Sequence, residues 1–233
     1  MKTAVISDIH GNVEALKSVL ERIDSMNISN IVCLGDIVGY GASPNECVAL
    51  IRSRNIRSVV GNHDKAVTGA LSTSNFSLIA KLGVEWTRSV MEKEHIDFMN
   101  GLPYSFESND AHFVHSSPDL PQLFRYLFTQ DDAAESFEAF DTKICFIGHT
   151  HRPVIFCEDG MTETIVAGKR CIVNVGSVGQ PRDGDWRACF LVFDEEQFSI
   201  EHIRVEYNVD AAAAKIIAAG LPQKLADRLK LGV

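Results

Sequence analysis

The sequence lacks the features of a membrane-bound or exported protein. No apolar stretch approaches the roughly 18 residues that a membrane span requires. The short apolar run over residues 4–6 is followed by Asp8, too early for a secretory signal. Internal repeats, low-complexity tracts and linker-like segments are also missing. We therefore expect a cytoplasmic protein that makes no membrane contact and folds as a single domain over residues 1–233.

Basic residues are in the minority. The 233 residues include 22 Lys and Arg against 31 Asp and Glu, which gives a formal net charge of −9. Non-specific binding to nucleic acid relies on basic patches, so this balance disfavours it. A small phosphorylated substrate stays possible, because a bound metal ion can locally reverse the sign of the field.

The cysteines lack the C-x-x-C spacing of metal-binding or redox motifs. Several lie inside apolar runs that are typical of strands. We therefore expect buried, reduced thiols and no cysteine-ligated zinc. The six cysteines are Cys33, Cys47, Cys145, Cys157, Cys171 and Cys189.

Short apolar runs and helical patterns alternate in the first part of the chain, and 45% of all residues are hydrophobic. The pattern predicts strands at 2–7, 30–34 and 57–60 and helices at 13–25 and 44–54. Asn12 is a candidate N-cap, and Ser43 to Glu46 reads as a capping box with a proline at the first helical position. This β-α-β-α-β opening implies parallel strands with right-handed crossovers.

The later chain is richer in strands. A helical region is expected over 75–100 and another over 209–230. Predicted strands lie at 111–115, 143–147, 153–157, 162–167, 171–175, 188–193 and 198–207. An α/β fold with a mixed two-sheet core and helices outside accounts for this order.

Polar residues follow the predicted strands at the point where each strand ends. Five times an apolar run leads into Asp, His or Asn, usually beside a glycine, and five of the eight histidines lie in these loops. The carboxyl ends of strands form the ligand crevice of α/β sheets. Two pairs, Asp8 with His10 and His149 with His151, are spaced i, i+2, which in an extended segment puts both side chains on one side.

The donor set indicates a metal centre. Carboxylate and imidazole together suit manganese, iron, zinc and similar ions, whereas magnesium alone prefers oxygen. The seven candidates are too many for one tetrahedral site and suit two adjacent ions, with Asp36 as the natural bridge. They are Asp8, His10, Asp36, Asn62, His115, His149 and His151.

These motifs, in this order over residues 8–151, resemble those of the calcineurin-like metallophosphoesterase superfamily. The motifs are Asp8-x-His10, Gly35-Asp36, Gly61-Asn62-His63-Asp64, His115 and Gly148-His149-x-His151. Residues 174–182 resemble the C-terminal segment of small bacterial stand-alone members, which are often labelled phosphodiesterases or diadenosine-tetraphosphatase-like proteins. The resemblance implies a four-layer α/β/β/α sandwich of two mixed sheets flanked by helices.

The resemblance also implies residue roles. Asp8, His10 and His151 would bind one ion and Asn62, His115 and His149 the other, with Asp36 shared. His63 would be the catalytic residue beside the metals, contacting phosphate or protonating the leaving oxygen. Two divalent ions about 3.5–4 Å apart can convert a bridging water to hydroxide and clamp the attacking and leaving oxygens. We expect manganese, while these donors also permit iron, zinc, cobalt or nickel.

The sequence departs from the phosphoserine and phosphothreonine phosphatases of this superfamily. Those relatives carry Gly-Asp-x-x-Asp-Arg and an arginine before Gly-Asn-His. Here Gly39 replaces the carboxylate that would orient His63, and Tyr40 and Val60 replace the two arginines. This argues against a phosphoprotein phosphatase and weakens the similarity to diadenosine tetraphosphate hydrolases. What orients His63 stays open.

Substrate contacts are less well specified. Arg182 and Arg125 are candidates, because each lies in a loop soon after a predicted active-site strand; a solvated surface arginine is the alternative for both. Tyr40 is a third candidate. Residues 118–128 are rich in apolar side chains and could form a lid, an oligomer contact or ordinary core packing. His112, His95 and His202 are expected to be structural.

The function expected from these observations is hydrolysis of phosphomonoesters or phosphodiesters, with small nucleotide-like substrates. Hydrolysis of dinucleoside polyphosphates is the alternative within the enzyme class. A non-catalytic scaffold, as in the retromer subunit that keeps this fold, is a third possibility, yet it predicts eroded ligands and all seven positions are filled here. A homo-oligomer is possible.

Overall fold

The computed structural model describes residues 1–166 and 168–233, which form two mixed β-sheets. The first sheet has the order β11-β10-β1-β2-β3 and contains β1 (Lys2–Ile6), β2 (Asn30–Cys33), β3 (Arg57–Ser58), β10 (Ala188–Asp194) and β11 (Ser199–Val205). The second has the order β4-β5-β6-β9-β7-β8 and contains β4 (Ser105–Ser108), β5 (Ala111–Val114), β6 (Ile144–Ile147), β7 (Val154–Cys157), β8 (Gly160–Thr162) and β9 (Cys171–Asn174). Strands β1, β2 and β3 pair in parallel, as the opening pattern predicts.

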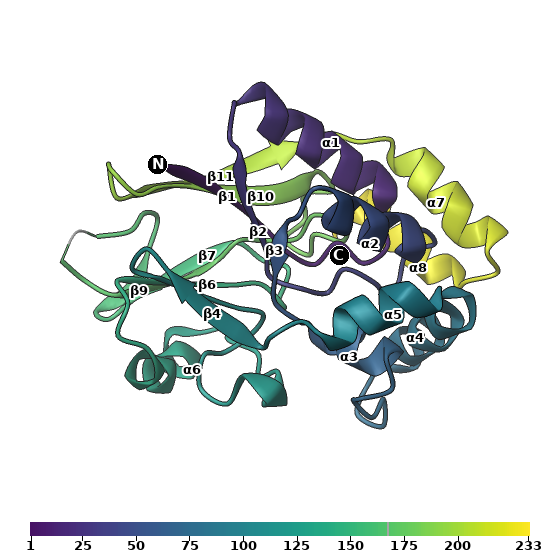
Figure 1. The fold of residues 1–233 in the computed structure, drawn as a ribbon, viewed down its shortest axis with the longest axis horizontal. Coiled ribbons are helices and arrows are strands. Elements are labelled where there is room, and N and C mark those ends of the chain that lie inside the picture. Colours follow the sequence, from purple (N-terminus) through teal and green to yellow (C-terminus); the bar gives the residue numbers. More distant parts are fainter. Residues whose placement is uncertain (167) are drawn as a thin grey trace.

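Helices cover the outer faces of both sheets (Figure 1). The first sheet is covered by α1 (Val13–Ser25), α2 (Pro44–Ser53), α7 (Val209–Ala218) and α8 (Gln223–Leu231). The second carries α6 (Gln130–Ala134) and the short 3-10 helices Pro121–Leu123 and Glu135–Ala139, while α3 (Asn62–Val67), α4 (Leu78–Val90) and α5 (Lys93–Asn100) follow β3 at one end of the sandwich. Within the described ranges, no helix combines the length and apolar character needed to cross a bilayer.

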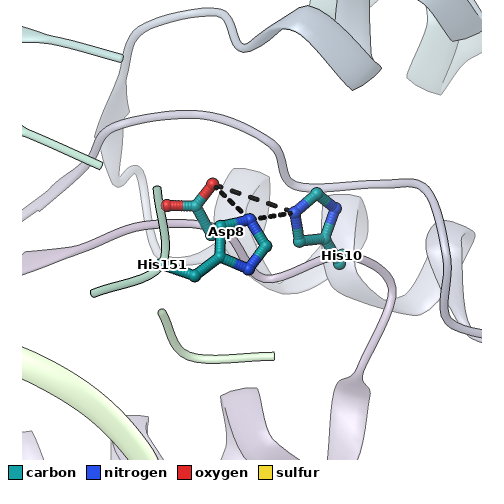
Figure 2. A group of neighbouring side chains, drawn as sticks. All are labelled: Asp8, His10 and His151. Carbon is teal, nitrogen blue, oxygen red and sulfur yellow. Dashed lines mark hydrogen bonds and ion pairs between the residues drawn. The ribbon is translucent and has the colours of Figure 1, made fainter. Parts of the chain in front are cut away.

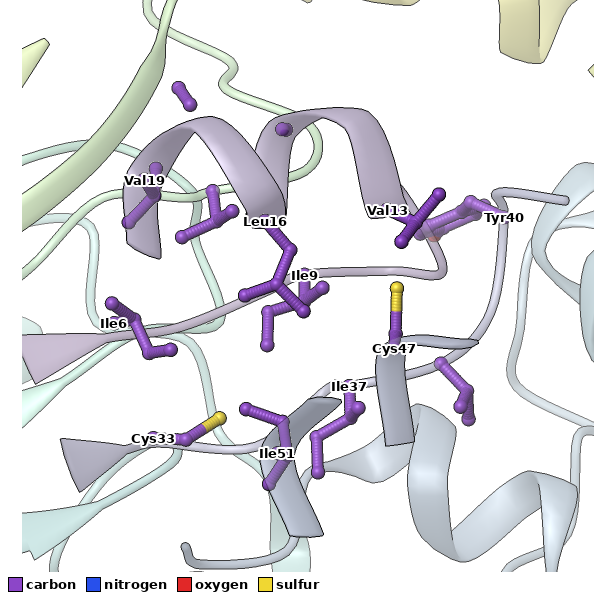
Figure 3. Packing of buried hydrophobic residues seen from close by; sticks show 14 of the residues in the cluster. Ile6, Ile9, Val13, Leu16, Val19, Cys33, Ile37, Tyr40, Cys47 and Ile51 are labelled. Atoms are coloured by element: carbon purple, nitrogen blue, oxygen red, sulfur yellow. The ribbon is translucent and has the colours of Figure 1, made fainter. Parts of the chain in front are cut away.

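Three apolar cores separate the four layers, because successive side chains of a strand point to opposite faces. In β1, Ala4 and Ile6 pack under the helices, in the core shown in Figure 3, while Val5 faces the second sheet. In β6, Phe146 lies between the sheets and Cys145 packs on the opposite face, towards α6. Burying one large apolar side chain contributes about 2 kcal/mol. The predicted α/β/β/α sandwich is confirmed.

Most predicted elements are present, and the differences have local causes. The Asn12 side chain accepts a hydrogen bond from the Ala15 main-chain N–H at 3.1 Å and caps α1, as predicted. The prediction of a capping box at Ser43 is wrong. The Ser43 hydroxyl accepts no hydrogen bond from the first turn of α2 and instead accepts one from Lys215 Nζ at 3.4 Å. The predicted helix at 209–230 is two helices, since Gly220 adopts a positive φ of 72° between them.

The remaining differences between the predicted and the observed elements are one displaced strand and three short elements that were not predicted. The predicted strand at 162–167 is displaced: β8 begins at Gly160 and ends at Thr162, and residue 167 lies outside the described residues. Strand β4 and helices α3 and α6 were not predicted. The two helices have 6 and 5 residues, which is less than two turns and too short for a readable helical period.

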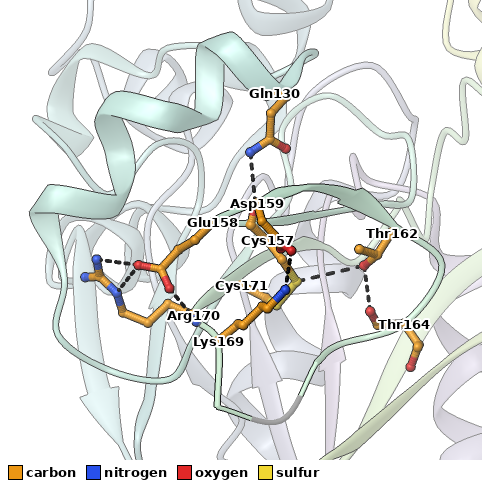
Figure 4. The surroundings of a disulfide bond; sticks show 9 residues. All are labelled: Gln130, Cys157, Glu158, Asp159, Thr162, Thr164, Lys169, Arg170 and Cys171. Atoms are coloured by element: carbon orange, nitrogen blue, oxygen red, sulfur yellow. Dashed lines mark hydrogen bonds and ion pairs between the residues drawn. A yellow bond between two sulfur atoms is a disulfide. The ribbon is translucent and has the colours of Figure 1, made fainter.

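The expectation of six reduced cysteines is wrong for two of them. Antiparallel pairing of β7 with β9 places Cys157 opposite Cys171, with Cα atoms 4.1 Å apart, and the two form a disulfide (Figure 4). A 14-residue separation gave no indication of this pairing, which depends on strand register. The other four cysteines are free and buried, as expected. Disulfides are uncommon in cytosolic proteins. Reduced cysteines therefore no longer support the expectation that the protein is cytoplasmic.

Candidate metal centre

The seven predicted metal ligands come together at the carboxyl ends of five strands. Each follows its strand within a few residues: Asp8 and His10 follow β1, Asp36 follows β2, Asn62 follows β3, His115 follows β5, and His149 and His151 follow β6. All seven side chains are at most 7% exposed. Residues up to 143 positions apart in the sequence therefore share one buried cluster, because parallel strands deliver their ends to the same edge.

The first half of the cluster contains Asp8, His10 and His151 (Figure 2). The Nε2 atoms of the two imidazoles are 3.1 Å apart. Asp8 Oδ1 lies 3.3 Å from His151 Nε2 and 3.8 Å from His10 Nε2. Three donor atoms thus converge on one point.

The second half contains Asn62, His115 and His149. His115 Nε2 lies 3.1 Å from His149 Nδ1 and 3.2 Å from Asn62 Oδ1. Asp36 connects the halves, since its Oδ2 is 3.6 Å from His10 Nε2 and 3.5 Å from His115 Nε2. One carboxylate oxygen therefore faces both groups.

Main-chain carbonyls determine which nitrogen of each imidazole faces the cluster. The four contacts are His10 Nδ1 with Val38 O at 3.2 Å, His115 Nδ1 with Leu34 O at 2.8 Å, His149 Nε2 with Phe124 O at 3.0 Å and His151 Nδ1 with Gln180 O at 2.6 Å. A carbonyl only accepts, so each contacting nitrogen carries the hydrogen. The opposite nitrogen of each ring then directs a lone pair into the cluster, which is the arrangement that metal-binding histidines adopt.

This arrangement fits a pair of divalent cations. In the first half the lone pairs of His10 and His151 face each other at 3.1 Å, which is repulsive unless a positive charge lies between them. Asp8 Oδ1 is also buried without a hydrogen-bond partner. Such a group is costly to bury unless it binds a cation. The mixed nitrogen and oxygen donors suit manganese, iron, zinc, cobalt or nickel.

The other carboxylate oxygens are held by the main chain. Asp8 Oδ2 accepts from the His149 N–H at 2.9 Å, and Asp36 Oδ1 accepts from the His63 N–H at 2.8 Å. At Gly148 a Cβ would lie 2.5 Å from Asp8 Oδ2, so the chain can approach this closely only without a side chain. Each aspartate is thereby left with one oxygen for the cluster.

The ligand loops have an unusual backbone. Asp8, His10, Asp36, His149 and His151 all have positive φ, between 49° and 66°. The expectation that both i, i+2 pairs lie in extended segments is therefore wrong, although the two side chains of each pair do meet. Left-handed conformations are unfavourable for residues with a Cβ, and they concentrate at functional sites where surrounding contacts maintain them.

The electrostatics of the cluster favour ionised carboxylates and neutral imidazoles. Burial raises the pKa of Asp8, but the imidazoles, His151 first, outweigh it and hold that pKa well below its usual range. Burial lowers the pKa of His149 to about 3. His115 differs, because Asp36 outweighs burial and raises the pKa of His115 to about 9. A cation in the cluster would compete with that proton for the same lone pair.

His63 lies beside the cluster, at the start of α3, without a carboxylate to orient it. Its Nδ1 is buried with no hydrogen-bond partner in the described structure, and a Cβ on Gly39 would come within 2.5 Å of this atom. The imidazole lies between two aromatic rings, with centroid distances of 4.5 Å to Tyr40 and 5.1 Å to Phe76. Aromatic packing on Tyr40 and Phe76 therefore holds the ring.

Asp64 connects two loops of the cluster and is not one of the seven candidate ligands. Its Oδ1 accepts from the main-chain N–H groups of Ile37 and Val38 at 2.9 and 3.2 Å, and its Oδ2 accepts from the Gly61 N–H at 3.0 Å. The loop bearing Asp36 is thereby fastened to the loop bearing Asn62.

A cavity of about 360 Å³ opens beside the cluster. It is lined by Asn62, His63 and His149 and by two of the three predicted substrate contacts, Tyr40 and Arg182. Its size is within the range of pockets for small ligands. The cavity supplies a place for a substrate in contact with the cluster.

The structure does not bring Arg125, the third predicted substrate contact, into this cavity. Its Nη1 pairs with Asp119 Oδ2 at 2.9 Å, and it lines a separate hollow rich in acidic residues. Phe76 and Arg228 are among the lining residues that were missed. Arg228 lies on the amphipathic helix α8, where a basic residue in the sequence is indistinguishable from a solvated one.

The apolar segment 118–128 lies over the cluster. Tyr126 stacks on His149 with ring centroids 4.0 Å apart, and the Phe124 carbonyl accepts from the same imidazole. Leu123, Phe124 and Tyr126 line the cavity, while Leu127 is buried in the core beneath the second sheet. The segment therefore combines a cover over the site with core packing.

The three histidines that are expected to be structural lie away from the cluster. His112 contacts Glu107, His95 contacts Asn45, and His202 contacts the Asn174 carbonyl.

Comparisons with known proteins agree with this geometry. Residues 1–197 match the calcineurin-like phosphoesterase superfamily domain. An uncharacterised protein of Methanocaldococcus jannaschii is 44% identical over 239 residues, which cover 98% of this chain and 97% of that protein. The crystal structure of a metallophosphoesterase from Sphaerobacter thermophilus has a TM-score of 0.89 at 40% identity and covers 100% of this chain and 99% of its own.

A shorter similarity is to a symmetrical bis(5'-nucleosyl)-tetraphosphatase of Baumannia cicadellinicola. It is 38% identical over 68 residues, which cover 28% of this chain and 23% of that enzyme.

Proposed function

Because the chain belongs to the calcineurin-like phosphoesterase superfamily, we propose that it hydrolyses phosphoesters of small, nucleotide-like molecules with two divalent cations. Family membership supports a metal-dependent phosphoester hydrolase, and the similar protein from Sphaerobacter thermophilus is described as a metallophosphoesterase. The single observation that carries the two-cation assignment is the position of Asp36. Its Oδ2 lies within 3.6 Å of a histidine nitrogen from each half of the cluster.

In this proposal the cluster divides into two cation sites. Asp8, His10 and His151 would hold one cation and Asn62, His115 and His149 the other, with Asp36 shared. When bound, such cations lower the pKa of a coordinated water and stabilise negative charge on phosphoryl oxygens. Manganese is our first choice, and the donor set leaves room for iron, zinc, cobalt or nickel.

The surrounding residues would position the substrate and supply a proton. Nδ1 of His63 packs against Gly39, which leaves Nε2 as the ring nitrogen available to the substrate. We assign His63 Nε2 the transfer of a proton to the leaving oxygen, a role that imidazoles fill in many enzymes. Burial lowers the pKa of His63 to about 4, so in this proposal the negative charge of the bound phosphoester favours the protonated ring. Arg182 and Tyr40 lie in the cavity wall, where a guanidinium can bind a phosphoryl oxygen.

Hydrolysis of dinucleoside polyphosphates is a second candidate. The local similarity to the symmetrical tetraphosphatase favours it, but covers only 28% of the chain. Arginines that related hydrolases carry are replaced by Tyr40 and Val60. A non-catalytic scaffold is disfavoured, since the cluster keeps its complete donor set and Asp8 Oδ1 has no partner of its own.

The test begins with removal of copurified metal by chelation and addition of manganese. Hydrolysis of p-nitrophenyl phosphate and of bis-p-nitrophenyl phosphate is then measured. We expect activity that appears only with the cation, and the ratio of the two rates ranks monoesters against diesters. Nucleotides and dinucleoside polyphosphates follow as substrates. A complete lack of metal-dependent hydrolysis with all five candidate metals would exclude the enzyme and favour the scaffold.

A further inference from the structure

Two arginines without acidic partners line the cavity beside the cluster. Arg182 follows β9 and Arg228 lies on α8, and both are partly buried. Among the described residues, no Asp or Glu side chain forms an ion pair with either of them. By contrast, Arg125, Arg187 and Arg204 each pair with an aspartate. Arginines without an Asp or Glu partner in a cavity of an acidic protein favour an anionic ligand.

Each guanidinium is anchored in a way that leaves donors free. Arg182 Nη2 donates to Gln180 Oε1 at 2.9 Å, and its Nε is buried with no partner in the described structure. Arg228 Nε donates to the Val233 main-chain oxygen at 2.7 Å. No hydrogen bond from its Nη groups is present among the described residues. Both guanidinium groups are thus held in place and keep unused N–H groups, which is the arrangement that binds phosphate oxygens.

The two arginines lie at different depths. The Arg182 main-chain N–H donates to the carbonyl of the candidate ligand His151 at 3.2 Å, and burial first and then the charge of Arg182 lower the pKa of that imidazole. Arg228 is farther out, where Tyr40 and Arg182 are its charged or ionisable neighbours. Burial and then the charge of Arg182 lower the pKa of Arg228. Two guanidinium groups that repel each other are stabilised by a ligand carrying more than one negative charge.

We propose that Arg228, together with Arg182, binds a second phosphoryl group next to the scissile one, so that the preferred substrates contain a diphosphate or a longer phosphate chain. This inference rests on the proposed function, which places the scissile phosphoryl group at the cluster. Arg182 is close enough to contact both groups, and Arg228 contacts the outer one. The apolar lining of the same cavity, Leu71, Phe76 and Tyr126, offers a surface for a flat organic group such as a nucleobase.

Binding measurements test this without turnover. Methylenediphosphonate, which cannot be hydrolysed, is compared with methylphosphonate by calorimetry on the manganese-loaded protein. Arg228→Gln should weaken diphosphonate binding by about tenfold or more, as expected for lost charge-assisted hydrogen bonds, and methylphosphonate binding by less than about twofold. Arg182→Gln should weaken both ligands. Arg228→Lys should restore part of the diphosphonate affinity, because it restores the charge but not the fork.

The control is Arg52→Gln on α2, which removes a surface arginine paired with Glu94 and should change neither affinity. Thermal unfolding of each variant verifies that it folds. Equal weakening of both phosphonates by Arg228→Gln, or no weakening of either, would overturn the inference. Failure of the proposed function has a different signature: wild-type protein would not hydrolyse aryl phosphates with any metal, whatever the phosphonates show.

Discussion

The floor and the outer wall of the cavity are built differently. The floor consists of the seven candidate ligands, which are at most 7% exposed, and a main-chain carbonyl or N–H orients every histidine and aspartate among them. The outer wall consists of Phe76, Tyr126, Arg182 and Arg228, which come from four separate segments and are partly exposed. The floor therefore has one geometry, and the wall has room to differ between relatives.

The difference indicates where chemistry and specificity reside. Positive φ values at five floor residues are costly, and they persist because the surrounding hydrogen bonds maintain them. Such a floor can hold cations in a fixed position. The wall uses long side chains with free donors, which suit recognition of a variable organic group. Substitutions in the floor should abolish turnover, whereas those in the wall should redirect it.

The largest effect is expected for Asp36→Asn, which keeps the shape of the side chain and removes the charge shared by both cation sites. Turnover of an aryl phosphate should fall on the order of 10³-fold or more. Metal content, measured by elemental analysis, should fall as well. Asp131→Asn, an exposed residue on α6, is the matched control. Near-normal turnover by Asp36→Asn would contradict the bridging assignment.

His63→Gln should produce the next largest effect. Loss of a general acid costs about 10²-fold or more in kcat. Both cations should remain bound, because the main-chain N–H at position 63, which donates to Asp36 Oδ1, is retained. The comparison uses substrates with poor and good leaving groups: the loss should be larger for the poor one. Equal losses for the two substrates would show that His63 does not donate the proton to the leaving oxygen.

Phe76→Leu should have a moderate effect, because this residue acts on His63 through packing. Without the ring 5.1 Å from the imidazole, His63 gains freedom to rotate, and we expect kcat to fall about tenfold with metal content unchanged. Phe76→Tyr should restore kcat, since it restores the aromatic face. A fall in affinity alone, with kcat intact, would limit Phe76 to its place in the wall and exclude a part in the orientation of His63.

The smallest effect on turnover is expected at the disulfide, which joins β7 and β9 at the ends away from the ligand loops. Cys157→Ala with Cys171→Ala should leave kcat within about twofold, while lowering the free energy of unfolding by about 3 kcal/mol, the value for a loop of this length. Chemical denaturation measures the loss. Cys145→Ala, at a buried free thiol, is the control for lost packing. A thiol titration of unfolded, unreduced wild type should find four thiols; six would show that the bridge is absent.

Most of the floor could be predicted from the sequence, because each ligand directly follows a run of strand-forming residues. Asp8, Asp36 and His115 are each found by their position after such a run, and parallel strands bring those positions together. The backbone of the loops was not predictable: the i, i+2 pairs meet through left-handed residues and not through extended chain. A positive φ at Asp or His cannot be predicted from the sequence when hydrogen bonds from distant segments maintain it.

The sequence by itself determined the α/β layering, the identity of the donors and their placement at strand ends, since all three follow from local periodicity and residue chemistry. Only the tertiary structure decided which side chains form the wall, how His63 is held, and that Cys157 faces Cys171. Those outcomes depend on helix α8 packing against the loop after β9, on Phe76 approaching from the segment before α4, and on the register of β7 with β9. Contacts of this kind join segments whose spacing along the chain carries no signal, because they are selected by the packing of the whole core.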